Sequence, residues 1–116
     1  MQISESIKNE VAILTLRGNF LCEPDRLKLR ERLKSLVDKN TSQVVVDLHE
    51  VTCIDSMGLG TLIAAYTTLR RVGGDLKLAH VSDMVDQLLN MTKLVNVFES
   101  YETVERAAAS YKTGKK

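Results

Sequence analysis

A nearly unbroken apolar run, Val44 to Leu48, constrains the fold of this chain more than any other segment. A short run this rich in valine is typical of a strand that is covered on both faces and is therefore central in a sheet. Helical periodicity begins near Ser56, and the segment 76–79 has the pattern of the next strand. A strand, a helix and a strand within about 35 residues indicate a βαβ unit, in which the two strands are parallel and the crossover is right-handed.

The N-terminal segments predict a hairpin followed by a helix. The segments 3–7 and 11–16 have strand character and are separated by a short polar turn, so we expect them to pair in antiparallel fashion. After Gly18 the apolar residues change to helical spacing. The residues expected to face the core from this helix are Leu29, Leu33, Leu36 and Val37.

The C-terminal third is predicted to alternate helix and strand. A helix follows from Ser82, the apolar segment 94–98 gives a last short strand, and Ser100 caps a final helix. The order β-β-α-β-α-β-α-β-α predicts a single α/β domain: a mixed sheet with an N-terminal antiparallel hairpin and about four helices mainly on one face. We expect the domain to span residues 1–112, with 113–116 as a short basic tail.

Charge and hydropathy exclude several classes of function. The net charge is +1 and charges of both signs are scattered along the chain, which argues against direct nucleic-acid binding, because that needs a concentrated basic face. No apolar run approaches the roughly 20 residues of a membrane span, and the N-terminus lacks the hydrophobic core of a signal peptide. We therefore expect a cytoplasmic protein with no membrane partner. We also expect it to be a monomer or a weak dimer.

Ser56 is the candidate functional residue, and two interpretations of it are open. As a helix N-cap its hydroxyl would accept a hydrogen bond from a backbone N–H of the first turn, a structural role worth about 1 kcal/mol. As a modification site it would place a phosphate against the free N–H groups and the positive end of the helix dipole. The neighbouring Asp55 would repel that phosphate, however, and a partner surface suited to a neutral hydroxyl would lose contact through repulsion and desolvation.

Gly58 and Gly60 are unusual in the first turn of a helix, since glycine lowers helix stability by about 1 kcal/mol relative to alanine. Either a partner approaches the backbone closely here, or glycine relieves crowding against a neighbouring strand. The pattern is not a phosphate-cradling loop, because no Gly-Lys-Ser or Gly-Lys-Thr follows. No cofactor and no metal site are expected.

These residues carry a resemblance to a known family. The run from Val44 to Gly60, then Gly73-Gly74-Asp75-Leu76, then Met91-Thr92-Lys93-Leu94, resembles the anti-sigma factor antagonists, which are built on the STAS domain. The resemblance covers nearly the whole chain. Its most specific element is Asp55-Ser56-Met57-Gly58-Leu59-Gly60, which is similar to the family's Asp-Ser-x-Gly-Leu/Ile-Gly motif at the junction of a strand and a helix.

The resemblance implies a regulator that switches partners and is not itself an enzyme. In the family, the serine that matches Ser56 is phosphorylated by an anti-sigma factor that is also a serine kinase, and a phosphatase of the PP2C type reverses this. The unphosphorylated antagonist binds the anti-sigma factor and releases the sigma factor for transcription. The partner-binding positions implied here are Asn19, Leu21, Asp55, Met57, Gly58 and Leu59.

Two positions depart from the family pattern. Met57 stands where many members have a second serine, which leaves Ser56 as the sole acceptor in the motif. Leu21 stands where members often carry an aspartate, so the contacts of this loop with a partner should differ.

Two alternatives remain from the sequence. A serine on a tight turn from strand to helix is similar to the nucleophile of a hydrolase, and His49 and His80 would supply a base. Ser56 lacks the glycine two residues earlier that such a turn needs, however. The other alternative keeps the fold but makes the domain a scaffold in a signalling assembly or a regulatory module associated with transport.

Overall fold

The computed structural model describes residues 2–8, 10–20, 23–54, 56–91 and 98–113, and it contains one mixed sheet in the order β1-β2-β3-β4-β5. The strands are β1 (Gln2–Lys8), β2 (Val11–Phe20), β3 (Gln43–Ile54), β4 (Asp75–Ala79) and β5 (Ser100–Tyr101). β1 pairs with β2 in antiparallel fashion, and all other neighbouring strands are parallel. The predicted N-terminal hairpin and parallel βαβ unit are confirmed.

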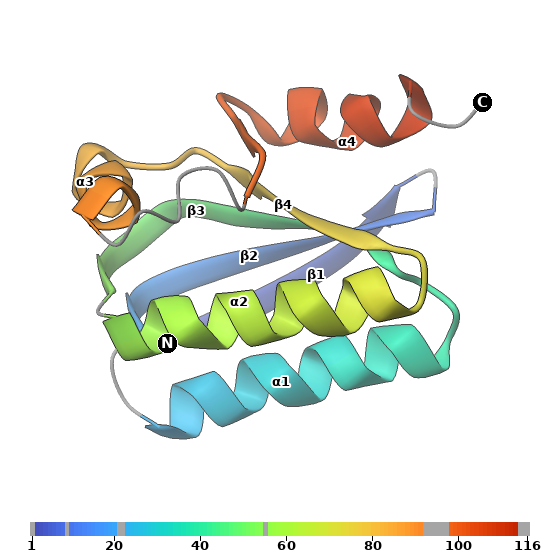
Figure 1. Ribbon diagram of the computed structural model, residues 1–116, viewed down its shortest axis with the longest axis horizontal. Helices are drawn as coiled ribbons and strands as arrows, with labels where there is room; N and C mark the ends of the chain where they lie inside the picture. Colours follow the sequence, from blue (N-terminus) through green and yellow to red (C-terminus); the bar gives the residue numbers. More distant parts are fainter. Residues whose placement is uncertain (1, 9, 21–22, 55, 92–97, 114–116) are drawn as a thin grey trace.

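The helices are α1 (Glu23–Asp38), α2 (Ser56–Arg71), α3 (Asp83–Met91) and α4 (Val104–Thr113). Figure 1 shows α1 and α2 side by side on one face of the sheet, α4 on the opposite face, and α3 at one end. The core on the side of α1 and α2 also includes Val85 and Leu89 of α3, so helices lie mainly on one face, as predicted, and α4 is the exception. No helix in the described parts of the chain is long and apolar enough to cross a bilayer.

β3 is buried on both faces, which explains its run of valines. Val44, Val46 and Leu48 are fully buried and belong to the core beneath α1 and α2. Val45 points to the other face and packs in the second core, with Ala107 and Tyr111 of α4. Full burial of each side chain of this size contributes about 1.5–3 kcal/mol, so β3 is the central support of both layers.

The predicted stripe of apolar residues on α1 is also found in the core. Leu29, Leu33 and Leu36 of α1 are buried, and Val37 packs at the edge. On α2 the buried apolar side chains are Leu59, Leu62, Ala65 and Leu69, and Ile63 and Tyr66 pack at the edge of the core.

Two details of the C-terminal third differ from the prediction. The last strand that the structure describes is Ser100–Tyr101, which pairs with Leu78 and Ala79 of β4, whereas the predicted strand was 94–98, of which 94–97 lie outside the described residues. Of the predicted segment only Phe98 is described, and it is buried in the core. Ser100 is therefore in a strand, and the cap of α4 is Thr103, whose Oγ1 accepts a hydrogen bond from the Arg106 amide at 3.1 Å.

Candidate functional site

Ser56 is the first residue of α2 and follows the end of β3 at Ile54 by a single intervening position. The predicted placement of this serine, at the start of a helix directly after a buried strand, agrees with the structure. Asp55 lies outside the described residues, and for Ser56 the structure describes the backbone. The first backbone N–H groups of a helix have no partner within the helix, and together they form its positive end.

The first turn of α2 combines an anchor and an exposed side chain. Leu59 is buried, so it holds the turn against the sheet. Gly58 is buried as well. Met57 is 62% exposed, and the first turn carries no acidic residue. The turn therefore presents Met57 to solvent on a rigid support.

The surroundings of Gly60 exclude one of the two interpretations of Gly58 and Gly60, namely that glycine relieves crowding at this position. A Cβ placed on Gly60 would have no heavy atom within 4 Å, apart from its chain neighbours and the backbone of its own helix turn. Crowding against a neighbouring strand is therefore not the reason for glycine at this position. The open space outside Gly60 faces solvent.

Of the predicted contact residues outside the motif, Asn19 and Leu21, the structure describes Asn19. Asn19 lies in β2, and its backbone pairs in register with Cys53 near the end of β3, one strand away from the start of α2. This register places Asn19 at the same end of the sheet as Ser56. Leu21 lies outside the described residues.

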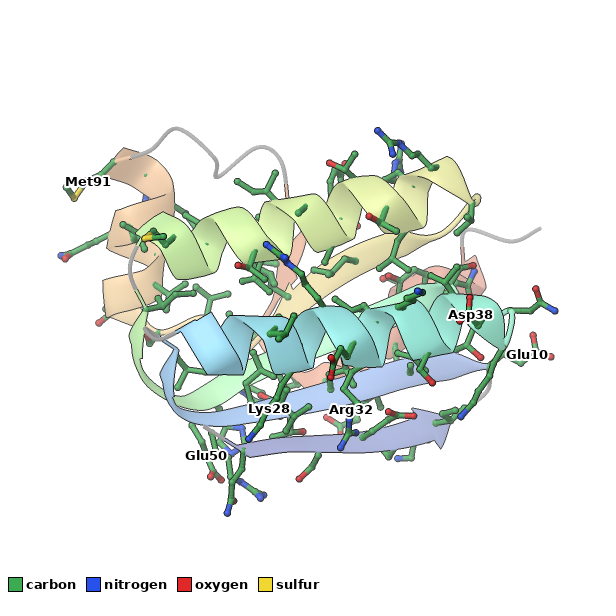
Figure 2. All side chains as sticks on the ribbon, turned by 90° about the horizontal axis from the view of Figure 1, so that it is seen from below. Glu10, Lys28, Arg32, Asp38, Glu50 and Met91 are labelled. Carbon is green, nitrogen blue, oxygen red and sulfur yellow. The ribbon has the colours of Figure 1, made fainter. Side chains whose placement is uncertain are left out.

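Met91 is an exposed residue at this end of the molecule that the sequence analysis named only as part of the family resemblance. It is the last residue of α3 and is 79% exposed. Figures 1 and 2 show α3 at the end of the sheet where α2 begins, with Met91 pointing outward. Its spacing of three from Leu88 would have placed it on the apolar stripe, so only the structure reveals its exposure.

The two histidines lie on the other side of the sheet. Asp47 pairs with Ala79, which belongs to the core beneath α4, and His49 Nδ1 lies 2.9 Å from Asp47 Oδ1. The His80 ring stacks edge-on against His49 at 5.3 Å between centroids. Both imidazoles are therefore separated from α2 by the sheet, an arrangement that does not support the hydrolase alternative. No group of three or more His, Cys, Asp or Glu in the described segments is arranged to hold a metal ion.

His49 is held between two carboxylates. Besides the contact with Asp47, its Nε2 lies 3.0 Å from Glu50 Oε2, and Glu50 also pairs with Arg17 at 2.7 Å. The hydrogen bond to Asp47 is the main cause that raises the pKa of His49 above 6.5, with a smaller contribution from the charge of Glu50. An imidazole that faces acceptors at both nitrogens donates to both only when it is protonated.

The mixed sheet, the helix that starts at Ser56 and the support beneath its first turn define a domain class. The chain belongs to the STAS domain family, whose model matches residues 2–107. The resemblance inferred from the motif is thereby confirmed.

Individual relatives indicate a branch of that family. The chain is 31% identical to BtrV of Bordetella bronchiseptica, named as an anti-sigma factor antagonist, over 74% of each chain. It is 30% identical to the anti-sigma-B factor antagonist of Bacillus subtilis, over 61% of this chain and 64% of that one. The fold is similar to that of the Bacillus cell fate determinant SpoIIAA in its phosphorylated form, with a TM-score of 0.76 at 16% identity, covering 95% of this chain and 99% of that one.

Proposed function

We propose that this protein is an anti-sigma factor antagonist that is switched by phosphorylation of Ser56. The observation that carries the proposal is the position of Ser56 as the first residue of α2, beside the exposed Met57, on a turn fixed by the buried Leu59. The relatives named as anti-sigma factor antagonists support the general function. The phosphorylated form of SpoIIAA supports a phosphate switch on this fold.

In the unphosphorylated state, the start of α2 binds an anti-sigma factor and thereby releases its sigma factor. The contact surface consists of Met57 together with Asn19, Leu21 and Asp55, while the buried Gly58 and Leu59 keep the turn in place. A neutral serine hydroxyl fits closely against a partner, because it costs little to desolvate compared with a charged group.

Phosphorylation ends this binding without unfolding the domain. The anti-sigma factor is itself the serine kinase and transfers a phosphoryl group from its nucleotide to the Ser56 hydroxyl, whose proton is released. The phosphate adds about −1.5 to −2 charge, which the N-terminus of a 16-residue helix accommodates. The same charge is repelled and poorly desolvated at the partner surface, so the complex dissociates. A phosphatase of the PP2C type restores the hydroxyl.

The proposal also covers the location of the protein, its oligomeric state, and its need for a cofactor or nucleic acid. We place the protein in the cytoplasm, where its partners act on transcription, as a monomer or weak dimer. It requires no cofactor of its own, since the nucleotide belongs to the kinase. With a net charge of +1 it does not contact nucleic acid directly.

A pull-down from the native cell extract, with partners identified by mass, tests the proposal. The baits are wild type, Ser56→Ala, Ser56→Glu and, as a matched control, Ser6→Glu, which adds the same charge at an exposed position on the edge strand β1. We expect a kinase-like partner of about the antagonist's size on wild type, Ser56→Ala and Ser6→Glu, and its loss on Ser56→Glu. Equal binding by all four would contradict the switch, and a very large assembly on all four would indicate the scaffold function.

A further inference from the structure

A shallow groove runs between α1 and α2 on the outer surface of the helical layer. It has a volume of about 280 Å³. Apolar side chains form its floor and walls, and basic side chains form its rim on the α1 side. The floor and walls are formed by Leu33, Val37, Ala64 and Ala65, and the rim by Arg30 and Lys34.

The apolar character continues beyond the groove toward the start of both helices. Figure 1 shows that α1 and α2 run in the same direction and begin at the same end of the molecule. Met57 lies two turns before Ala64 on the same stripe of α2, and Leu27 lies two turns before Lys34 on α1. Met57 is 62% and Leu27 50% exposed, although both are large apolar side chains. From Met57 to Thr68 the stripe extends about 16 Å, or three helical turns.

Small residues on α2 allow a partner backbone to come close. Gly60 and Ala64 lie between Met57 and Thr68 on this stripe, and both are exposed. The open space outside Gly60 is part of the same surface. A groove with small residues on one wall and larger apolar anchors at one end suits an amphipathic helix laid along it.

The charge of the rim selects the partner. Arg30 and Lys34 lie one turn apart, and neither has an acidic partner among the residues that the structure describes. None of the described residues that line the groove is acidic. On the other side of the same helix the situation is different, since Arg32 pairs with Glu5 of β1 at 3.2 Å. Two cations along the α1 side of an apolar floor are complementary to carboxylates that lie along one edge of an apolar stripe.

We propose that the groove between α1 and α2 docks an acidic amphipathic helix of a partner protein. Its apolar side chains, spaced i, i+3 or i+4 and i+7, enter the groove and contact Met57 and Leu27, and its carboxylates pair with Arg30 and Lys34. A membrane is a poorer occupant, because the surface is concave and carries only two rim cations. This interaction surface shares Met57 with the proposed contact surface at the start of α2, but docking in the groove does not require phosphorylation of Ser56.

A peptide titration tests the groove. The probe is a fluorescein-labelled peptide of about 18 residues, long enough to form a helix, with leucine at helical spacing and glutamate on the flanks. Its twin carries lysine in place of every glutamate. Because the net charge of the protein is only +1, nonspecific attraction hardly favours either peptide. We expect the acidic peptide to bind roughly tenfold tighter or more and to shift the amide signals of residues 30–37 and 60–68 in NMR spectra.

Two double charge reversals on α1 supply the matched comparison. Arg30→Glu with Lys34→Glu should weaken binding of the acidic peptide by about tenfold or more, because like charges then face each other. Lys28→Glu with Arg32→Glu has the same spacing and charge change, and Figure 2 shows these residues on the side of α1 toward β1. This second pair should leave binding within about twofold, and thermal melting verifies that both variants are folded.

Three outcomes would overturn the proposal. Equal binding of both peptides would show that the rim does not select charge. Equal weakening by both double variants would show that overall charge, and not the groove, is responsible. Failure of the acidic peptide to bind, together with binding to phosphatidylglycerol vesicles that is lost only in the Arg30 and Lys34 variant, would assign the surface to a membrane.

Discussion

The hydroxyl of Tyr111 in α4 binds both backbone polar groups of Val44 in β3, 67 residues away in sequence. It donates to the Val44 carbonyl oxygen at 2.7 Å and accepts from the Val44 amide at 3.2 Å. Burial raises the pKa of the Tyr111 hydroxyl, which keeps it protonated and able to donate. This pair fastens α4 to the central strand.

Tyr111→Phe should therefore lower the free energy of unfolding by about 1–3 kcal/mol, because it removes a buried hydroxyl partner from two backbone groups. Urea denaturation measures the change. Tyr101→Phe is the control, since its hydroxyl donates to the exposed Glu99, and it should cost about 0.5 kcal/mol or less. An equal loss of unfolding free energy in both variants would mean that the contact between Tyr111 and Val44 contributes little to stability.

The ion pairs of His49 predict a pH dependence of stability. The pKa of His49 is raised in the folded state, so its contribution to stability is fully present below about pH 6.5 and is lost as the pH rises through the folded-state pKa. His49→Gln should lower the melting temperature most near about pH 5.5 and least near about pH 8.5. Melting curves that differ by the same amount at every pH would contradict the charged state of His49.

Gly60→Ala should stabilise the protein by about 0.5–1 kcal/mol. The added Cβ meets no atom within 4 Å, and the substitution restores helix propensity in the interior of α2. Chemical denaturation compares it with Gly73→Ala, which has equally open space but a φ of +84°. The latter should cost about 1 kcal/mol, because a side chain is strained in this conformation. A loss of stability for Gly60→Ala would show that glycine is needed there by the fold itself.

Gly74→Ala should destabilise the protein by about 1–3 kcal/mol for a different reason. A Cβ at Gly74 would collide with the backbone carbonyl oxygen of Ser42, which accepts a hydrogen bond from the Asp75 amide at 3.0 Å. The backbone cannot move aside without lengthening this bond at the start of β4. Hydrogen exchange at the Asp75 amide should accelerate in the variant, and unchanged exchange would argue against the clash.

The fold could be predicted where the pattern of residues was strong. The apolar run at 44–48 and the periodic leucines of α1 and α2 correctly predicted a central strand and two surface helices. The pattern did not show that β3 continues to Ile54, because His49 and Glu50 interrupt its apolar character while the backbone still pairs with β2. It also did not indicate the strand Ser100–Tyr101, since two residues paired with β4 carry almost no periodicity.

Lys77 illustrates a residue whose environment the sequence does not indicate. A lysine in a strand is normally exposed, yet this one is 7% exposed. Its Nζ donates to Ser110 Oγ at 2.7 Å, lies 3.2 Å from Glu99 Oε1, and sits 4.3 Å from the centre of the Tyr111 ring. These partners come from α4 and from the residue just before β5, so the pocket for the charge exists only once α4 has packed on the sheet.

For the candidate site too, some features follow from local sequence and others only from tertiary structure. Local sequence determined that a helix begins at Ser56 after a buried strand, because strand burial and helix starts depend on neighbouring residues. Tertiary structure alone decided that His49 and His80 lie across the sheet from α2, and that Arg30 and Lys34 border a groove with Ala64 and Ala65. Both depend on which face of the sheet each segment occupies, and that is set by packing between segments far apart in the chain.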